Sequence, residues 1–347
     1  MPVIRDCFTG AVLIAAVAFC TISQGMADPV AEFYKGKRIS MMVGSSAGGG
    51  YDAYARLVTR HLGKHIPGNP TFVVQNMPGG GGLRVTNYLY NIAPKDGTAM
   101  ATVQRAILTS PLIEGRNIQI EYDPLKFNWL GSLNSETGLI VVWHTAPHQT
   151  MKDLFDKELL VGSSTPATDF LPLFLNNVLN TKLKIVAGYK SSVDVYLAVE
   201  RGELQGRVST GWAGDKEILQ PWLEKKQVRL LAQLSTAKNP EFPDVPLILD
   251  FARNERERQA MELILSSQLW GRPFVMPPDV PKERIEAVRR GFSAMLNDAE
   301  FLEEAKKMRM DLDPISGAEI EQLLQRVFSA PPDLVEYTRK SILESKP

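Results

Sequence analysis

The sequence has only two cysteines, and both lie near its start. Cys7 and Cys20 fall within the first 27 of 347 residues. The rest of the chain therefore has no thiol for a disulfide, for nucleophilic catalysis or for a cysteine-ligated metal. These three kinds of site are excluded for everything that follows residue 27.

An excess of charge and long apolar runs are also missing. The chain has 39 Lys and Arg against 39 Asp and Glu, so its formal net charge is zero. Nucleic-acid-binding proteins carry a basic excess or stripe, and we therefore expect no nucleic-acid partner. No run beyond residue 27 reaches the ~18 apolar residues of a transmembrane helix. Recognition of an anion must then depend on local groups, because the protein has no overall positive field.

The first 27 residues have the pattern of a secretory signal peptide. Arg5 provides a positive start, residues 11–20 form a short apolar run, and Gly25 and Ala27 are small residues at the −3 and −1 positions. Spanning a bilayer takes ~20 apolar residues, so a membrane anchor is the weaker interpretation. The pattern predicts export with cleavage near Ala27.

Short apolar segments alternate with glycine-rich loops and helical patterns. Residues 38–43 are apolar, a glycine-rich loop follows at 44–50, and residues 52–64 show helical spacing. A second strand, loop and helix follow over residues 71–90. This order predicts an α/β fold with parallel strands. Further strands are expected at 98–103, 139–143, 159–162, 184–187, 205–210 and 229–234, and further helices at 151–157, 170–179, 192–201, 255–265, 282–295, 299–308 and 318–329.

The loop from Gly44 to Gly50 is the main candidate for a binding site. Its glycines leave successive N–H groups unshielded, and the helix start adds unpaired N–H groups and a positive dipole end. Together they predict a site for an anion that needs no charged side chain. Ser45 and Ser46 add hydroxyl donors. Asp52 would repel a carboxylate, so it is expected to cap the helix or to hold the loop; a plain glycine-rich turn is the alternative.

Two enzyme motifs also match this segment. The residues around Ser46 fit the Gly-x-Ser-x-Gly pattern of serine hydrolases, but that triad needs a histidine late in the chain and none follows His148. Residues 48–53 fit a dinucleotide-binding pattern, yet Gln75 stands near the position of the ribose-binding acid. A secreted serine hydrolase using Ser46 therefore remains the alternative function, and no cofactor is expected.

The second glycine-rich loop and the histidines are less informative. Residues 76–82 serve either ligand contact or scaffold, and Asn76 can bridge backbone groups of the neighbouring loop. His61 and His65 are four residues apart on a predicted helix, a spacing that can hold zinc. Arg60 and Lys64 flank them, with no acid nearby in sequence. We therefore expect a polar helix face and no metal site.

Several motifs, in order, resemble those of one receptor family. Residues 48–56, 74–82 and 96–98 look like the N-terminal signature of the tripartite tricarboxylate transporter receptors, the Bug family. Residues 162–164 and 243–246 resemble later motifs of the same family, as do Gly188, Tyr189 and Lys190. The resemblance covers most of the chain after residue 27.

The resemblance implies a two-lobed α/β periplasmic binding protein of the type II-like fold, with a ligand cleft between the lobes. Residues 28–133 and 267–347 would form lobe 1, and residues 134–266 lobe 2. Family ligands are mostly small carboxylates, held by backbone amides and hydroxyls of two facing loops. The chain is thus expected to be a monomeric, non-catalytic periplasmic receptor that delivers its ligand to a membrane permease. A receptor that only signals to a membrane sensor is a further alternative.

The expected ligand-binding residues come from both lobes. They are Ser45, Ser46, Gly48, Gly49, Gly50, Tyr51, Asp52, Gly81, Gln104 and Arg105 in lobe 1, and Ser163, Ser164, Thr165, Thr168, Tyr189, Thr210 and Trp212 in lobe 2. Tyr51, Tyr189 and Trp212 are candidate platforms for a ring or chain, with core packing as the alternative for each. Arg105 is expected to bind a second carboxylate, unless it is simply exposed.

Overall fold

The structure is a computed structural model that describes residues 28–113, 119–164, 166–189, 191–209 and 211–343. The predicted signal peptide lies outside these ranges. Thr165 and Thr210, and the side chain of Thr168, also lie outside the described residues. In the described part, no helix has both the length and the apolar character needed to cross a bilayer.

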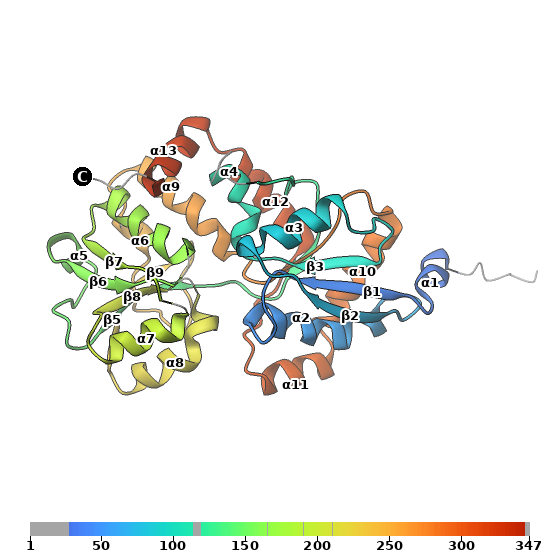
Figure 1. The fold of residues 1–347 in the computed structure, drawn as a ribbon, viewed down its shortest axis with the longest axis horizontal. Coiled ribbons are helices and arrows are strands. Elements are labelled where there is room, and N and C mark those ends of the chain that lie inside the picture. The colour runs from blue at the N-terminus through green and yellow to red at the C-terminus, as the bar shows by residue number, and fades with distance from the viewer. Residues whose placement is uncertain (1–27, 114–118, 165, 190, 210, 344–347) are drawn as a thin grey trace, which may run out of the picture.

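Two β-sheets, each flanked by helices, build two lobes that lie side by side (Figure 1). The first sheet has the strand order β11-β4-β10-β3-β1-β2. Its strands are β1 (Arg38–Val43), β2 (Thr71–Asn76), β3 (Ala99–Thr102), β4 (Asn128–Ser132), β10 (Pro273–Met276) and β11 (Ile315–Ser316). β1 runs parallel to β2 and β3, whereas β10 is antiparallel to β3 and β4.

The second sheet has the strand order β7-β6-β8-β5-β9. Its strands are β5 (Gly138–Trp143), β6 (Leu159–Gly162), β7 (Leu183–Val186), β8 (Gly206–Ser209) and β9 (Val228–Leu234). β6 is parallel to β7 and β8, and β5 is antiparallel to β8 and β9. Both sheets are thus mixed: each contains parallel strand pairs and one strand, β10 or β5, that is antiparallel to both of its neighbours.

Helices cover both sheets. They are α1 (Pro29–Tyr34), α2 (Gly50–His61), α3 (Leu83–Asn91), α4 (Ser110–Ile113), α5 (Asp153–Asp156), α6 (Pro166–Leu179), α7 (Ser192–Glu200), α8 (Trp212–Glu224), α9 (Glu255–Leu265), α10 (Lys282–Met295), α11 (Ala299–Lys307), α12 (Gly317–Phe328) and α13 (Pro332–Leu343). Short 3-10 helices are η1 (Leu62–His65), η2 (Gly80–Gly82), η3 (Arg105–Leu108), η5 (Ile248–Phe251) and η6 (Ser266–Gln268). The amphipathic spacing of α2 is typical: Ala55, Leu57 and Val58 are buried on one face.

The chain passes between the lobes at three places in the described part: residues 133–137, residues 266–272 and the link from α12 to α13. The first two segments are hydrogen-bonded to each other, since Gly271 N donates to Asn134 O and Glu136 N donates to Gln268 O, each at 2.8 Å. α13 then packs on α6 and α9 beside the second sheet. The lobe boundaries given above stay a prediction; they place α13 in lobe 1.

Candidate functional site

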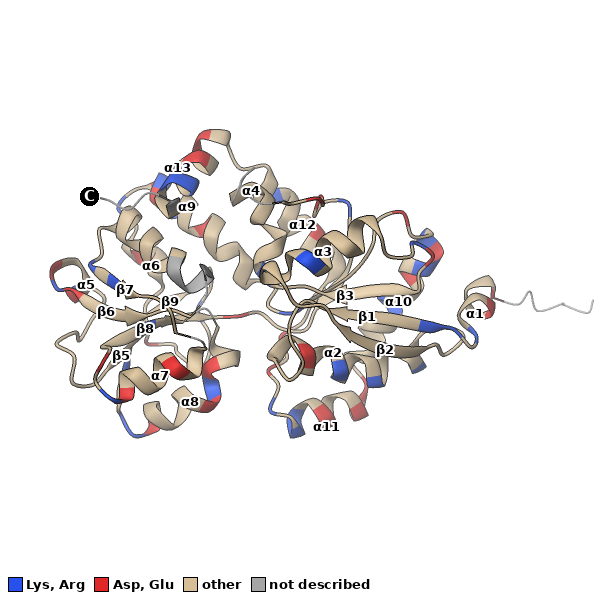
Figure 2. Ribbon diagram, viewed as in Figure 1, with Lys and Arg blue, Asp and Glu red and all other residues tan. Residues whose placement is uncertain are grey.

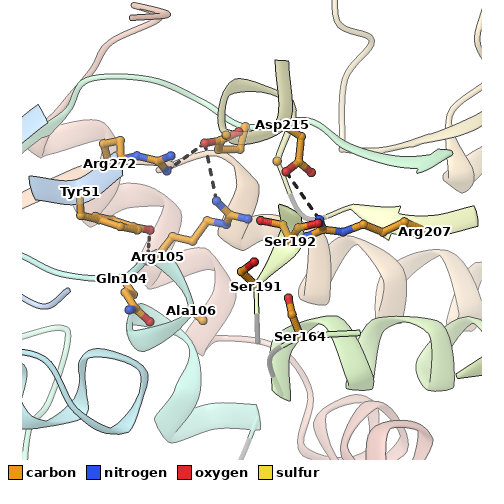
Figure 3. A pocket seen from close by; sticks show the side chains of 13 residues that line it. Tyr51, Gln104, Arg105, Ala106, Ser164, Ser191, Ser192, Arg207, Asp215 and Arg272 are labelled. Atoms are coloured by element: carbon orange, nitrogen blue, oxygen red, sulfur yellow. Dashed lines mark hydrogen bonds and ion pairs between the residues drawn. The ribbon is translucent and has the colours of Figure 1, made fainter. Parts of the chain in front are cut away.

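A cavity of about 450 Å³ lies between the lobes (Figure 3). Its lining is Tyr51, Gln104, Arg105, Ala106 and Arg272 from the first-sheet lobe, Glu136 from a crossing segment, and Ser164, Ser191, Ser192, Arg207, Gly211, Gly214 and Asp215 from the second-sheet lobe. This volume is within the range of pockets for small molecules. Most of the residues that line it have polar or charged side chains, so the cavity offers hydrogen-bond and ion-pair partners to a polar solute.

Glu136 lies beside two arginines on the first-sheet side. Its Oε1 is 2.9 Å from Nη1 of Arg272 and 3.8 Å from Nη1 of Arg105. The side chains of Arg272 and Glu136 are only 8% and 1% exposed, so each charge needs the other for compensation. Burial is the largest single effect and acts to lower the pKa of Arg272, but the Glu136 carboxylate together with Tyr51 and Tyr54 outweighs it, so the pKa is raised. Arg272 is therefore charged at any physiological pH.

Two aromatic side chains fix these arginines in place. The Tyr51 hydroxyl accepts a hydrogen bond from Arg105 N at 3.0 Å and donates to Gly271 O at 3.1 Å. The Arg272 guanidinium lies 4.6 Å from the centre of the Tyr51 ring, a cation–π arrangement. Trp270 Nε1 donates to Arg105 O at 3.0 Å. The backbone of Arg105 is thus held on both sides, which directs its side chain toward the cavity (Figure 3).

On the second-sheet side, Arg207 and Asp215 form a second buried charge pair. Arg207 Nη1 is 3.8 Å from Asp215 Oδ1 and donates to Ser192 O at 3.2 Å. Asp215 Oδ2 accepts hydrogen bonds from the Tyr196 hydroxyl at 2.7 Å and from the Ser209 hydroxyl. Burial, and next the Asp215 carboxylate, raise the pKa of Tyr196 well above its ordinary value. Tyr196 therefore remains a neutral hydroxyl donor to Asp215.

Two helices of the second-sheet lobe begin at the cavity. α7 is capped by Ser191, whose hydroxyl accepts from Asp194 N at 3.2 Å. α8 begins after Gly211 and has no side-chain cap. A Cβ on Gly211 would lie 2.5 Å from Oε2 of Glu136, so only glycine permits this close approach. Glu136 thus reaches from the crossing segment to the positive end of α8.

Four of the predicted binding residues line the cavity: Tyr51, Gln104, Arg105 and Ser164. The glycine-rich loop before α2 does not line it, and Ser46, Gly48, Gly49 and Gly50 are exposed on the surface while Ser45 is half-buried. Gly81 lies against the side chain of Gln104. Ligand contact by the loop and by Gly81 remains a prediction.

Asp52 organises the loop, one of the roles predicted for it. It accepts hydrogen bonds from Gly48 N, Arg56 Nε and Asn76 Nδ2, each at 2.9 Å. The bond from Arg56 is the main cause that lowers the pKa of Asp52 to about 2. Asn76 also donates to Ser45 O at 3.0 Å, so it bridges the two glycine-rich loops as predicted.

The remaining predicted residues lie inside the second-sheet lobe. Ser163 is buried, and its backbone N–H donates to Val186 O at 2.9 Å. Trp212 is 4% exposed and packs in a hydrophobic cluster that Tyr189 also contacts. The Trp212 Nε1 donates to Glu241 at 2.8 Å. Trp212 thus packs in the core of this lobe, and ligand contact by Ser163, Tyr189 and Trp212 remains a prediction.

The chain is similar to several known proteins. No family model matches the chain. A curated protein described as "UPF0065 protein in gbd 5'region", from Cupriavidus necator, is 25% identical over 253 residues, which cover 67% of this chain and 71% of that protein. A TctC solute-binding protein from Polaromonas superposes with a TM-score of 0.66 at 17% identity, over 87% of this chain and 99% of that one.

Two Rhodopseudomonas palustris structures are also similar. One, with adipate, has a TM-score of 0.62 and 17% identity over 87% of this chain and 97% of that one. The other, MatC with bound malate, has a TM-score of 0.60 and 18% identity over 86% of this chain and 99% of that one. This chain has the TctC/Bug solute-binding-protein fold. The resemblance found in the sequence motifs is confirmed, and so is the two-lobed α/β fold.

The sequence did not reveal most of the charged lining of this cavity. It predicted an anion site at the glycine-rich loop that needs no charged side chain, and of the charged lining it named only Arg105. Glu136, Arg207, Asp215 and Arg272 line the cavity as well. Ser191 and Ser192 were also missed. A usable signal existed in one case: Arg207 is a lone charge inside the strand β8, whose four residues are all buried. A charge at such a position needs a buried partner or a ligand.

The histidines and Ser46 do not form a catalytic set in the described ranges. His61 Nε2 lies 2.6 Å from Glu304 and His65 Nε2 lies 2.8 Å from Asp298, both on or next to α11. No hydrogen bond joins the Ser46 hydroxyl to a histidine among the residues that the structure describes. The same residues contain no group of three or more His, Cys, Asp and Glu that could hold a metal ion.

Proposed function

We propose that this chain is an extracytoplasmic solute receptor that binds a small carboxylate in the cavity between its lobes. It would then deliver that carboxylate to a tripartite tricarboxylate-type membrane transporter. The observation that carries the proposal is the small-molecule cavity into which Arg105 and Arg272 project from one lobe, opposite the start of α7 in the other. Guanidinium groups match carboxylates in charge and in hydrogen-bond geometry.

The hydrogen bonding of Arg272 supports a ligand at this position. Its Nη1 is used by Gly271 O and by Glu136, whereas its Nη2 has no hydrogen-bond partner among the described residues. A ligand carboxylate at Nη2 would supply that missing acceptor. About three charge-assisted hydrogen bonds at ~1.5–3 kcal/mol each give roughly 5–9 kcal/mol, and micromolar affinity needs about 8 kcal/mol. Such a site is sufficient for micromolar binding when apolar contacts offset the cost of ordering.

The fold and the sequence support the cellular role. The signal-peptide pattern of residues 1–27 favours export. Proteins of the same fold are described with adipate and with malate, both small carboxylates. We therefore place the protein in the periplasm as a monomeric, non-catalytic receptor, with permease subunits as its membrane partner.

Ligand-induced thermal stabilisation tests the binding function. The exported chain is screened against mono-, di- and tricarboxylates, aliphatic and aromatic. At least one acid should raise Tm, because a ligand that binds only the folded state stabilises it. Arg105→Gln should weaken that ligand about tenfold or more, while Arg326→Gln, a remote change of the same charge, should not. The proposal fails if no carboxylate stabilises the protein, or if both variants bind alike. Uptake of the identified acid by cells with and without the gene then tests delivery.

A further inference from the structure

Arg207 is a charged residue in the middle of a buried sheet. It belongs to β8, which lies between β6 and β5 and whose four residues are all buried. Its side chain is only 6% exposed, and it lines the cavity from the second-sheet lobe. A buried guanidinium is costly unless its charge and its N–H groups find partners. The partners of Arg207 therefore indicate what this residue does.

The described residues use only part of the Arg207 guanidinium. Its Nη1 donates to Ser192 O at 3.2 Å and lies 3.8 Å from Asp215 Oδ1, a distance too long for a hydrogen bond. Nε is buried without a hydrogen-bond partner, and no hydrogen bond joins Nη2 to a described residue. Asp215 accepts hydrogen bonds from the hydroxyls of Tyr196 and Ser209 on its other oxygen, Oδ2. The guanidinium therefore has donors left for an acceptor in the cavity.

The position of the guanidinium is nevertheless fixed. It lies 4.7 Å from the centre of the Tyr196 ring in a cation–π arrangement, and the Tyr196 hydroxyl is itself bonded to Asp215 at 2.7 Å. Ser192 is the first residue of α7, so the hydrogen bond to its carbonyl joins β8 to this helix. Figure 3 shows Arg207 reaching into the cavity from the side opposite Arg105. A side chain held in this way can meet a ligand at little cost in ordering.

We infer that Arg207 is the residue through which the second-sheet lobe binds the ligand. The inference rests on the proposed function. One carboxylate of the ligand would lie at Arg105 and Arg272, and an oxygen at its other end would accept a hydrogen bond from Nη2 of Arg207. An acid with a plain alkyl chain would cover that N–H group without offering an acceptor. The cavity therefore selects bifunctional acids, which carry a second carboxylate, a carbonyl or a hydroxyl at the far end, over alkanoates of the same chain length.

Matched pairs of ligands measure this selectivity directly. Calorimetry compares adipate, monomethyl adipate and 6-hydroxyhexanoate with hexanoate, glutarate with pentanoate, and succinate with butanoate; weak ligands are measured by displacement of the tightest one. Any other acid that passes the thermal screen is compared with its analogue that ends in a methyl group. In the native chain, the bifunctional acid of each pair that binds should bind about tenfold or more tightly, which is the effect of one hydrogen bond to a charged group.

Replacing Arg207 should abolish this preference. Arg207→Met keeps an apolar stem but removes the donors, so the bifunctional acid should bind about tenfold or more weakly while the Kd of the alkanoate changes less than about twofold. A merely structural role of Arg207 would weaken both ligands alike and leave their ratio unchanged. Arg289→Met removes a partly buried arginine from an ion pair with Glu321 outside the cavity, and the ratio should stay as in the native chain.

The outcomes separate this inference from the proposed function. If alkanoates bind the native chain as tightly as their bifunctional partners, or if Arg207→Met leaves the ratio unchanged, Arg207 is not a ligand contact although a carboxylate receptor remains. If no acid binds at all, the proposed function itself fails. If Arg207→Met does not fold, as judged by circular dichroism, Arg207→Lys replaces it: the charge beside Asp215 is kept but the planar guanidinium is lost, and the ratio should still fall about threefold or more. An unchanged ratio in that variant would equally overturn the inference.

Discussion

Tyr51 shows how one side chain joins three parts of the site. Its hydroxyl lies between the backbone of Arg105 and that of Gly271, and its ring lies under the guanidinium of Arg272. The sequence predicted Tyr51 as a platform for the ligand. Because one face of the ring is occupied by Arg272, its structural task is to position the arginines.

Removing the Tyr51 hydroxyl should therefore affect stability and binding together. Tyr51→Phe keeps the ring but loses two hydrogen bonds, so the free energy of unfolding should fall by about 1–2 kcal/mol. The Kd of the identified ligand should rise about threefold to tenfold, because Arg105 is held less firmly. Urea unfolding and calorimetry measure the two effects. Tyr88→Phe, outside the cavity, serves as the control; an unchanged Kd in Tyr51→Phe would contradict the positioning role.

Substitutions of Arg272 and Glu136 should have strongly non-additive effects on the free energy of unfolding. Arg272→Met leaves Glu136 buried beside only the more distant Arg105, and the free energy of unfolding should drop by about 3–5 kcal/mol. Adding Glu136→Gln removes the unpaired charge, so the double variant should be more stable than Arg272→Met alone. Urea unfolding of the four proteins in the cycle gives the coupling. Additive losses would show that the two side chains do not compensate each other.

For single residues, the sequence indicated which side chains could contact a ligand. It could not show which residues far apart in the chain lie close together in the fold. Gln104 and Arg105 were expected near the ligand because they follow a predicted strand, and both line the cavity. Glu136 and Arg272 are brought together by the hydrogen bonds between two crossing segments. Local periodicity carries no information on such pairing.

Charged residues occur on both α2 and α11, which pack against each other (Figure 2), and ion pairs join α2 and the following η1 to α11 and its N-cap. Asp298 binds Lys64 and His65, and Glu304 binds Arg60 and His61. The hydrogen bond from Lys64 is the main cause that lowers the pKa of Asp298, and that from His61 is the main cause for Glu304. Both carboxylates are thus harder to protonate in the folded state than in the unfolded state.

These ion pairs should make the thermal stability of the protein depend on pH. A carboxyl whose folded pKa is depressed stabilises the fold above its unfolded pKa, and the contribution is lost as pH falls through the folded value. We therefore expect Tm to decline as pH drops below about 4. Asp298→Asn should have a lower Tm than the native chain at pH 7, and the difference should vanish at low pH. Thermal scans between pH 2 and 7 measure this, with Glu283→Gln, an exposed residue of α10, as control. A constant difference at every pH would contradict it.

Helices and strands whose apolar residues recur with a clear period could be predicted from the sequence, and those without such a period could not. β1, the loop after it and α2 follow from an apolar run, glycines and helical spacing. α8 was missed because Gly214 and Pro221 interrupt its pattern and lower helix propensity. β10 was missed as well, since its four residues gain their antiparallel partners only when the chain returns from the other lobe.

At the scale of the whole molecule, one ion pair connects the lobes beside the cavity. Lys216 of α8 lies 3.3 Å from Asp311, which follows α11, and 3.1 Å from Glu241. Burial acts to lower the pKa of Lys216, but Glu241 and Asp311 raise it. The charged form therefore persists, and the pair favours the arrangement in which the lobes are close.

Breaking that pair should speed ligand release. Lys216→Met should raise the Kd about twofold to fivefold, mostly through a higher dissociation rate, since partly exposed pairs contribute up to about 1 kcal/mol. The native rate should approach that of the variant in high salt. Stopped-flow fluorescence measures the rates, with Lys282→Met as control. Equal dissociation rates at low salt would show that the pair does not restrain the lobes.

The repeated passage of the chain between the lobes has a practical consequence. A protease cut introduced within residues 133–137 would leave two further covalent routes between the sheets, and Arg339 of α13 would still hold the carbonyls of Leu112 and Ile113. The cleaved protein should elute as one particle in gel filtration yet run as two bands on a denaturing gel. A split protein of this kind offers two new termini between the lobes, where a pair of fluorophores would report a change in the distance between them when a ligand binds.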